Sequence, residues 1–465
     1  MSQNRSENCP ESRSESPLRL LKIDTRSDSV EEQIAELREK LSPNGNIVSE
    51  RGRALTVRVF GEAIPPVEVV KRICRDISQN GISALLRYCR LLDGADLTAE
   101  TIRVPREELE KAWKAASPEY LRSIRRIKEN IVDFQKAILH KDVRIERPGG
   151  YLVERYRPLR RVGVCIPGGA AAYPSSLLMT AVPAQVAGVQ QIAVMAPPTA
   201  FGSYNADLLA ACYEIGVTEV YRMGGAQGVA ALAYGVDGIE QVDKIVGPGN
   251  LFVALAKREV YGTVDIDSIA GPSEVVVIVD ESTRADWTAA DLMAQSEHSP
   301  GSSILIGWNE EVLDQAVEAV EKALGTIERG DLTRQALETF GAVILTKDQD
   351  EACRIANQIA PEHLHIATSN AEQLAEKIPC AGAIFLGNSC PVAVGDYAAG
   401  PSHVLPTGGT ARFASGLTTN DFLRANSILY FDPAGLKNLA PDICRIATVE
   451  GLTAHRLSVT SRTEE

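Results

Sequence analysis

The segment LMAQSEHSPG (292–301) places two potential metal ligands three residues apart. Positions i and i+3 of a helix lie on one face, so Gln295 and His298 would point the same way. One interpretation is half of a metal site, which needs further ligands from elsewhere in the chain. The other is a solvated last turn of a helix, ended by Pro300 and Gly301. The segment taken alone favours the second interpretation.

The segment IAPEHLHI offers acid–base chemistry. It places Glu362 beside His363 at the predicted end of a helix, just after Pro361. A carboxylate and an imidazole that line one cleft form a general acid–base pair near neutral pH. A Glu–His step on the surface is equally compatible with the sequence.

Two further segments carry candidate residues near the C-terminal end. VGDYAAGPSHVLPTGGT contains Asp396 and His403 in a stretch rich in Gly and Pro, and long loops of that kind are often functional. VEGLTAH contains Glu450 and His455, which on a single last helix would flank a ligand from different directions. An exposed helix is the simpler interpretation of this last segment.

A metal site would combine ligands from several of these segments. Gln295, His298, Asp396 and His455 together supply two imidazoles, one carboxylate and one amide oxygen. Such nitrogen and oxygen ligands suit zinc, with manganese or cobalt as substitutes. Spacing alone does not select these four residues.

Strand and helix patterns alternate along two stretches that must position these residues. The alternation predicts an α/β protein with two doubly wound, Rossmann-like units of similar kind. We expect a disordered tail (1–17), an N-terminal helical segment (18–50), a first α/β domain with most metal and acid–base candidates (51–160 and 274–417), a second α/β domain (161–273) and a C-terminal helical segment (418–465).

Four glycine-rich turns adjoin the predicted strands: IPGGAAAYPSS, MGGAQG, VGPGN and AGPSE. Ligands of open α/β sheets bind beyond the carboxyl ends of the strands, where glycine permits close approach and helix N-termini favour anions. None of the turns matches G-x-G-x-x-G. Together with the adjacent Gln227 and Asn250, they favour a cleft for a nucleotide diphosphate over four unrelated tight turns.

Composition excludes several classes of function. The net charge of −13 argues against nucleic acid or an anionic membrane as the main partner, and we interpret the basic run RYRPLRR (155–161) as a charged loop. Nine scattered cysteines without a C-x-x-C pair indicate reduced thiols in a cytoplasmic protein. The sequence contains neither a signal-peptide pattern nor an apolar run long enough to span a membrane.

Six motifs occur in a fixed order: VDKIVGPGN, IAGPSEVVVIVD, AQSEH, IAPEHL, GDYAAGPSHVLPTGGTARF and EGLTAH. Over roughly residues 30 to 460 the sequence closely resembles the histidinol dehydrogenases. The resemblance implies a zinc-dependent, NAD-linked oxidation of L-histidinol to L-histidine through the aldehyde, in the last steps of histidine biosynthesis. A related enzyme for another small alcohol, such as a sulfonated diol, is the alternative. Glu450 favours histidinol, because a carboxylate repels a sulfonate.

The resemblance also implies roles for individual residues. The zinc ligands would be Gln295, His298, Asp396 and His455, and the acid–base pair would be Glu362 and His363. The expected substrate contacts are Ser273, Gln295, His298, His363, Asp396, His403, Glu450 and His455.

The NAD contacts implied by the resemblance are Cys165, Gln227 and Asn250. The family commonly has Tyr at the position of Cys165 and Asn at the position of Ser402, so these positions depart from its pattern. The resemblance further implies an intertwined homodimer, in which Glu450 and His455, with His403, complete the site of the partner subunit.

Overall fold

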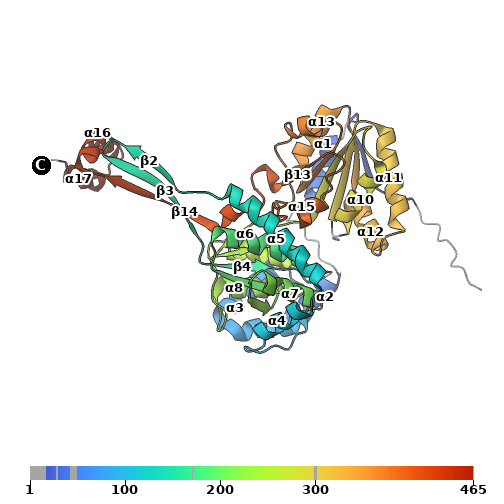
Figure 1. The fold of residues 1–465 in the computed structure, drawn as a ribbon, viewed down its shortest axis with the longest axis horizontal. Helices are drawn as coiled ribbons and strands as arrows, with labels where there is room; N and C mark the ends of the chain where they lie inside the picture. Colours follow the sequence, from blue (N-terminus) through green and yellow to red (C-terminus); the bar gives the residue numbers. More distant parts are fainter. Residues whose placement is uncertain (1–16, 28–29, 42–49, 170, 298–300, 464–465) are drawn as a thin grey trace, which may run out of the picture. The chain divides into compact units, whose positions relative to one another are not determined.

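The computed structural model describes residues 17–27, 30–41, 50–169, 171–297 and 301–463. The chain divides into two compact units (Figure 1). Unit 1 comprises 1–47, 270–394 and 405–416, and unit 2 comprises 48–269, 395–404 and 417–465. The expected disordered tail at 1–17 lies, apart from Pro17, outside the described residues.

Unit 1 is built on a parallel sheet of six strands. Their order is β1-β11-β10-β9-β12-β13. The strands are β1 (Leu21–Asp24), β9 (Ser273–Val279), β10 (Gly301–Gly307), β11 (Ala342–Leu345), β12 (His363–Ala367) and β13 (Ala383–Leu386). If β9 to β13 are numbered 1 to 5 in chain order, their order in the sheet is 3-2-1-4-5, and β1 lies at the edge beside β11.

Helices cover both faces of this sheet. Val275 and Val277 of β9 pack on one face with α10 (Ala285–Ser296), α11 (Glu310–Leu324) and α12 (Gly330–Phe340). Val276 and Ile278 pack on the other face with α1 (Val30–Leu41), α13 (Gln349–Ile359) and α14 (Ala371–Ala375). This strict alternation follows from the two-residue period of a strand that is buried on both faces.

Unit 2 contains a second parallel sheet, in the order β6-β5-β4-β7-β8. Its strands are β4 (Arg161–Cys165), β5 (Gln191–Ala196), β6 (Glu219–Arg222), β7 (Lys244–Val246) and β8 (Asp265–Ile266). The order is again 3-2-1-4-5, and it reverses direction between β4 and β7. Two doubly wound parallel sheets with the same order confirm the prediction of two similar α/β units.

The helices between residues 50 and 138 belong to unit 2, whereas residues 51–160 were predicted to form one domain with 274–417. They are α2 (Glu50–Phe60), α3 (Pro66–Tyr88), α4 (Arg106–Ala115) and α5 (Pro118–Ile138). The apolar face of α3 packs with α8 (Gly225–Tyr234) and α9 (Leu251–Val260) on one side of the sheet. On the other side, α4 and α5 pack with α6 (Pro174–Ala187) and α7 (Ala206–Glu214).

Unit 2 also contains an antiparallel sheet in the order β14-β3-β2. It is formed by β2 (Val143–Arg147), β3 (Gly150–Pro158) and β14 (Leu423–Phe431), and helices α16 (Pro433–Val449) and α17 (Thr453–Thr460) follow it. The prediction that 418–465 is wholly helical is therefore wrong, and so is that for 18–50, which contains β1. Both strands are fixed by pairing with distant residues, which local periodicity does not reveal.

None of the helices in the described part of the chain could serve as a membrane span. The eight cysteines that the structure describes are all free thiols. The basic run 155–161 ends β3 and begins β4, and its arginines bond to acidic or amide side chains, for example Arg157 to Asp142 and Arg161 to Glu219.

Candidate active site

The expected site residues are divided between the two units. Unit 1 carries Ser273, Gln295, Glu362 and His363. Unit 2 carries Cys165, Gln227, Asn250, Asp396, His403, Glu450 and His455. His298 lies outside the described residues. Among the residues that are described, no three His, Cys, Asp or Glu side chains form a metal-binding group.

In unit 1 the site residues gather at the amino edge of the parallel sheet. Ser273 begins β9, His363 begins β12, and Glu362 directly precedes His363. Gln295 lies in the last turn of α10, and its carbonyl oxygen lies against Gly301, the partner of Ser273 on β10. Ligands were predicted at the carboxyl ends of the strands; in unit 1 the expected acid–base residues, Glu362 and His363, lie at the opposite edge.

The carboxyl edge of unit 1 is closed at the point where the strand order reverses. Asp280 follows β9 there, and its carboxylate accepts hydrogen bonds from the main chain and hydroxyl of both Ser282 and Ser369. Although burial raises the pKa of Asp280, these hydrogen bonds outweigh burial and the pKa is lowered. The carboxylate of Asp280 therefore joins the loops at Ser282 and Ser369.

Helix ends set the electrostatics of the amino edge. Both α10 and α13 end at this edge, at Ser296 and Ile359. The C-terminus of a helix carries a partial negative charge, which favours cations. The amino edge of unit 1 therefore suits a metal cation or a protonated amine.

The acid–base pair lies in a tight turn and not at a helix end. Helix α13 stops at Ile359, and Ala360 is the one described non-glycine residue with a positive φ (51°). Pro361 and Glu362 follow, and His363 is the first residue of β12. Both side chains are buried, and His363 Nδ1 lies 3.8 Å from Glu362 Oε2. The expected helical placement of this pair is thus corrected to a turn before a strand.

The ring of His363 is oriented by a main-chain carbonyl. Its Nδ1 lies 3.2 Å from the carbonyl oxygen of Glu274. Because a carbonyl oxygen only accepts, Nδ1 must donate, and the ring lone pair is then on Nε2. Nε2 is the nitrogen that can take a proton from a substrate.

A second buried pair, which the sequence analysis did not identify, docks α10 on β12. His365 Nδ1 lies 3.0 Å from Asp291 Oδ2, and His365 Nε2 lies 2.9 Å from the carbonyl oxygen of Gly387. Asp291 is four residues before Gln295, so both lie on one face of α10. The sequence signal for this pair is the position of His365, two residues after His363 and therefore on the same face of the strand.

In unit 2 the glycine turns do follow the carboxyl ends of strands. The turn VGPGN follows β7, next to the end of β4, where the strand order reverses. The carboxylate of Asp267 accepts a hydrogen bond from the main-chain N–H of Gly247. The side chain of Lys257 forms an ion pair with Asp267 and also donates to the carbonyl oxygen of Gly247. This buried ion pair fixes a turn in which Gly247 has φ 105° and leaves no room for a side chain.

The three expected NAD contacts lie near this edge but differ in accessibility. Cys165 ends β4, and burial of its thiol among core residues raises its pKa to about 12. Gln227 is buried, and its Nε2 donates to Asp93 Oδ2 (3.0 Å), whose pKa is raised by burial to about 6. Asn250 is exposed, and its Oδ1 caps α9. Of the three side chains, only that of Asn250 is open to a ligand.

Asp396 and His403 are linked within unit 2. Asp396 lies in α15 (Ala393–Tyr397), and its carbonyl oxygen lies 2.9 Å from His403 Nδ1. The neighbouring Ser402 is buried and donates to the carbonyl of Met179 in α6. The serine therefore anchors this segment to α6.

Glu450 and His455 lie on two helices, which corrects the expectation of one. Glu450 caps the end of α16, Gly451 turns the chain with φ 72°, and His455 lies in α17. Both side chains are exposed on the single chain.

Comparison with known proteins decides the family. The family model described as histidinol dehydrogenase matches residues 63–463. The chain belongs to the histidinol dehydrogenase family. A histidinol dehydrogenase of Rhodopirellula baltica is 59% identical over 442 residues, which are 95% of this chain and 96% of that protein. One of Heliobacterium mobile is 45% identical over 398 residues, 85% of this chain and 93% of that protein.

The fold agrees with this assignment. The crystal structure of histidinol dehydrogenase from Elizabethkingia anophelis superposes with a TM-score of 0.85 at 32% identity, and covers 96% of this chain and 98% of that one. As a histidinol dehydrogenase, the protein is an oxidoreductase of the last step of histidine biosynthesis.

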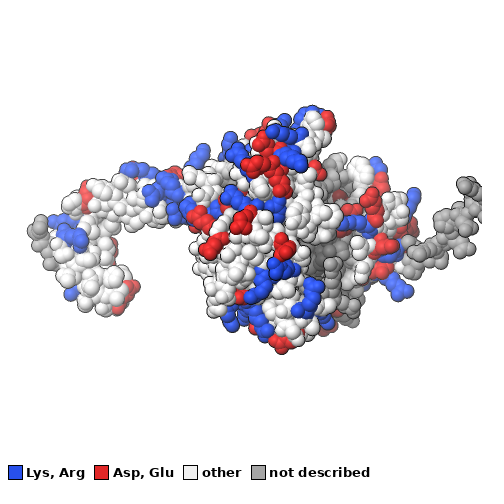
Figure 2. Space-filling view, turned by 90° about the horizontal axis from the view of Figure 1, so that it is seen from below, with Lys and Arg blue, Asp and Glu red and all other residues white. Residues whose placement is uncertain are grey.

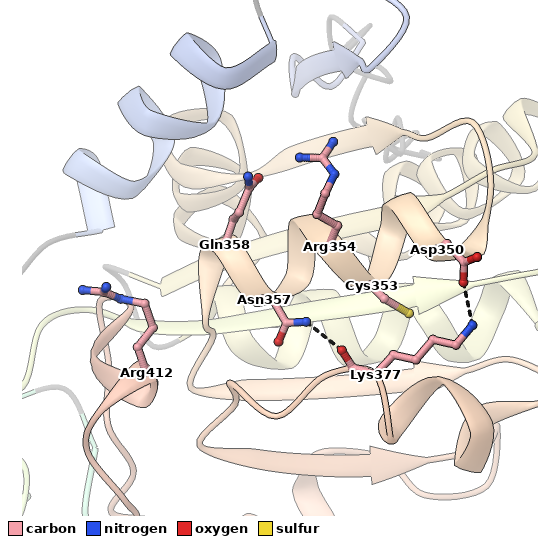
Figure 3. A pocket seen from close by; sticks show the side chains of 7 residues that line it. All are labelled: Asp350, Cys353, Arg354, Asn357, Gln358, Lys377 and Arg412. Carbon is pink, nitrogen blue, oxygen red and sulfur yellow. Dashed lines mark hydrogen bonds and ion pairs between the residues drawn. The ribbon is translucent and has the colours of Figure 1, made fainter.

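A cavity of about 690 Å³ in unit 1 does not belong to the histidinol dehydrogenase site (Figure 3). Its lining comes from α13, the segment after α14 and the turn at Arg412, and includes none of the site residues. Two contacts join its lining residues: Lys377 pairs with Asp350, and the carbonyl of Lys377 accepts from Asn357.

Proposed function

We propose that the protein oxidises L-histidinol to L-histidine through L-histidinaldehyde, with NAD as hydride acceptor and zinc as metal. The observation that carries this proposal is the buried pair of Glu362 and His363 at an edge of unit 1 where two helix C-termini favour a cation. Histidinol carries an amine and an imidazole, and both its protonated amine and its nitrogen lone pairs suit such an edge.

The zinc ion would be held by Gln295, His298 and Asp396, with His455 of the partner subunit. One observation supports the fit: Gln295 Nε2 is buried without a hydrogen-bond partner among the described residues. Since the two ends of an amide can be exchanged by rotation, its oxygen can equally face a cation from that position. When bound, zinc would fix the amino and imidazole nitrogens of the substrate and NAD⁺ would accept the hydrides.

His363 would act as the base in alcohol oxidation. With Nδ1 donating to the carbonyl of Glu274, Nε2 can take the hydroxyl proton as the hydride leaves the carbinol carbon. A protonated His363 would then return that proton to solvent before the second oxidation.

Glu362 would act in the aldehyde step. Its carboxylate would take one proton from a water molecule while the water oxygen bonds to the aldehyde carbon and the carbonyl electron pair moves onto the aldehyde oxygen, which gives the hydrate as its anion. Loss of a hydride from that carbon and of a hydroxyl proton to His363 would then give the carboxylate product. Burial of both side chains keeps other water away from the aldehyde.

NAD would bind at the carboxyl edge of unit 2. There α6, α8 and α9 begin after glycine-rich turns, and helix N-termini favour a diphosphate. Gly169 supports the fit. Its φ is not positive and a Cβ there would meet no atom within 4 Å, so neither the backbone conformation nor the packing of the chain requires glycine. A glycine at this position is explained if the cofactor approaches the main chain there. The Nδ2 of Asn250 is available to donate to the cofactor, because its Oδ1 caps α9.

A homodimer would complete the site. Leu439, Ile443, Ile446 and Val449 form an apolar stripe along α16, and each is more than a third exposed. Figure 2 shows a largely uncharged surface over the α16–α17 segment. A helix stripe of this kind is normally covered, and a second copy of the chain would cover it. The exposed Glu450 and His455 would then reach the site of the other subunit.

A panel of small amino and non-amino alcohols with NAD⁺, read by NADH absorbance, tests this proposal. L-histidinol should be oxidised fastest, activity should be lost on metal chelation, and added zinc should restore it. Faster oxidation of a sulfonated diol, or full activity of the metal-free protein, would contradict the proposal.

A further inference from the structure

Glu274 contacts both members of the acid–base pair from a position inside the sheet. It is the second residue of β9 and is completely buried. Its main-chain N–H donates to Glu362 Oε2 (3.0 Å), and its carbonyl oxygen accepts from His363 Nδ1 (3.2 Å). Its own Oε1 accepts from the main-chain N–H groups of Glu362 (3.3 Å) and Gly408 (3.0 Å).

The strand register explains why these groups meet. His363 pairs with Val275, so one residue earlier on each strand Glu362 lies beside Glu274. The chain turns sharply before this point, at Ala360 and Pro361, and β12 has not yet begun. The side chains of Glu362 and Glu274 therefore accept hydrogen bonds from main-chain N–H groups that would otherwise pair between the two strands.

The chemistry of the position indicates a neutral carboxyl group. Burial, and then the charge of Glu362, raise the pKa of Glu274 to about 8. On β12 the other titratable neighbour is His363. On β10 the paired position is Ser302, and the segment 405–409 contains no titratable side chain. Oε2 has no partner among the described residues, whereas Oε1 accepts two bonds, as the carbonyl oxygen of a protonated acid can.

We propose that Glu274 is a positioning residue for the acid–base pair, which holds the main chain of Glu362 and the loop at Gly408 with its buried carboxyl group. The inference rests on the proposed roles of Glu362 and His363. The carboxyl group of Glu274 holds the main chain at Glu362 and Gly408. With the main chain held there, the main-chain N–H and carbonyl of Glu274 meet Glu362 Oε2 and the ring of His363. Loss of this support affects the chemical steps and not the binding of histidinol.

Three variants test the inference. Glu274→Met keeps the volume but has no acceptor, Glu274→Gln keeps a neutral acceptor, and Asp280→Asn changes the buried carboxylate at the other end of β9. The readouts are kcat and KM for histidinol, kcat for added L-histidinaldehyde, and zinc content. In Glu274→Met, kcat of both reactions should fall by at least about tenfold, while KM stays within about threefold and zinc is retained.

The conservative variant and the control decide the interpretation. Glu274→Gln should recover kcat to within about threefold of the unmodified protein, and Asp280→Asn should not lower it. The inference is overturned if Glu274→Met keeps its kcat, if a folded Glu274→Gln is as slow as Glu274→Met, or if Asp280→Asn is equally slow. Should Glu274→Met fail to fold, Glu274→Leu, which also lacks an acceptor, takes its place, and a kcat within about threefold of that of the unmodified protein overturns the inference.

The result also separates this inference from the proposed function. If Glu362→Gln and His363→Asn both keep full kcat, the proposed roles of the pair are wrong. If these two variants lose kcat and Glu274→Met does not, only the positioning role of Glu274 is wrong.

Discussion

Glu274 near the start of β9 and Asp280 directly after its end both have buried carboxyl groups, and the pKa values of the two groups are shifted in opposite directions. Burial and the neighbouring Glu362 raise the pKa of Glu274 to about 8. At Asp280, hydrogen bonds from Ser282 and Ser369 outweigh burial and lower the pKa. The amino end of the strand thus carries a carboxyl group without full hydrogen bonding, next to the acid–base pair. The carboxyl end is closed by a satisfied carboxylate.

Glu274 should make folding depend on pH. Its pKa in the folded protein, about 8, lies above the ordinary value of 4.5, so the folded state holds a proton that the unfolded state has released. The stabilisation is complete below the ordinary value and is lost as pH rises through about 8, at up to about 1.4 kcal/mol per pH unit. Glu274→Gln cannot titrate, so its stability relative to the unmodified protein should rise between about pH 5 and about pH 8.

Asp280 provides the matched control for this measurement. Because its pKa is lowered from 3.8, its contribution is present above that value and is lost as pH falls through the folded pKa. In urea titrations, Asp280→Asn should therefore lose more stability at neutral pH than in acid, the reverse of Glu274→Gln. Parallel pH profiles for the two variants would contradict the assigned pKa of Glu274.

His363→Asn should lower kcat for histidinol by at least about a hundredfold, because the base for the alcohol proton is removed. An asparagine can still donate to the carbonyl of Glu274, so the turn should persist. Zinc content, measured by atomic emission, should be unchanged, since His363 is not a proposed ligand. His140→Asn, at an exposed histidine of unit 2, is the control. Loss of zinc from His363→Asn would argue against this assignment.

Local patterns were sufficient to predict two parallel sheets, although not every strand in them. The run SEVVVIV is continuously apolar after its second residue, as expected for a strand that helices cover on both faces. Local patterns did not reveal β1 and β14, because each is defined by a partner more than a hundred residues away in sequence. For the same reason, the helices of 51–160 were assigned to the wrong sheet: an amphipathic helix does not specify which apolar surface it covers.

The position of the site within unit 1 required the structure. AGPSE reads as one more glycine turn after a strand, yet Ser273 begins β9, so the residues around it lie at the amino edge. Glu274 is visible in the sequence as a single acidic residue before five apolar ones, but its role depends on Glu362, which is distant in sequence and adjacent only through the strand register. The burial of Gln227 against Asp93 likewise depends on the packing of distant segments.

Glu362→Gln should damage aldehyde oxidation more than alcohol oxidation. Glutamine keeps an oxygen that can accept from the main chain of Glu274, but it is too weak a base to take a proton from water. We expect kcat for added L-histidinaldehyde to fall at least about ten times more than the single-turnover rate of alcohol oxidation. Equal losses in the two rates would reject the water-activating role.

Ile446→Glu should disrupt the proposed homodimer. Ile446 is 57% exposed in the middle of the apolar stripe on α16, where a charge would be buried by a second subunit. Light scattering should show a monomer, with loss of activity. Leu332→Glu is the control, because Leu332 is 50% exposed, belongs to unit 1 and is not part of the stripe. If Ile446→Glu remains a dimer, the stripe on α16 is not the dimer interface.

Mixing two inactive variants tests whether the subunits share a site. If His455 of the partner subunit completes each site, then His363→Asn and His455→Ala are each inactive as homodimers. A mixed dimer, however, contains one site with both changes and one site with neither. After dissociation and reassociation of equal amounts, half of the dimers should be mixed, and activity should recover to roughly a quarter of that of the unmodified protein. The recovery should follow subunit exchange in time and be absent when the variants are mixed without dissociation. No recovery in demonstrably mixed dimers would mean that His363 and His455 serve the same subunit.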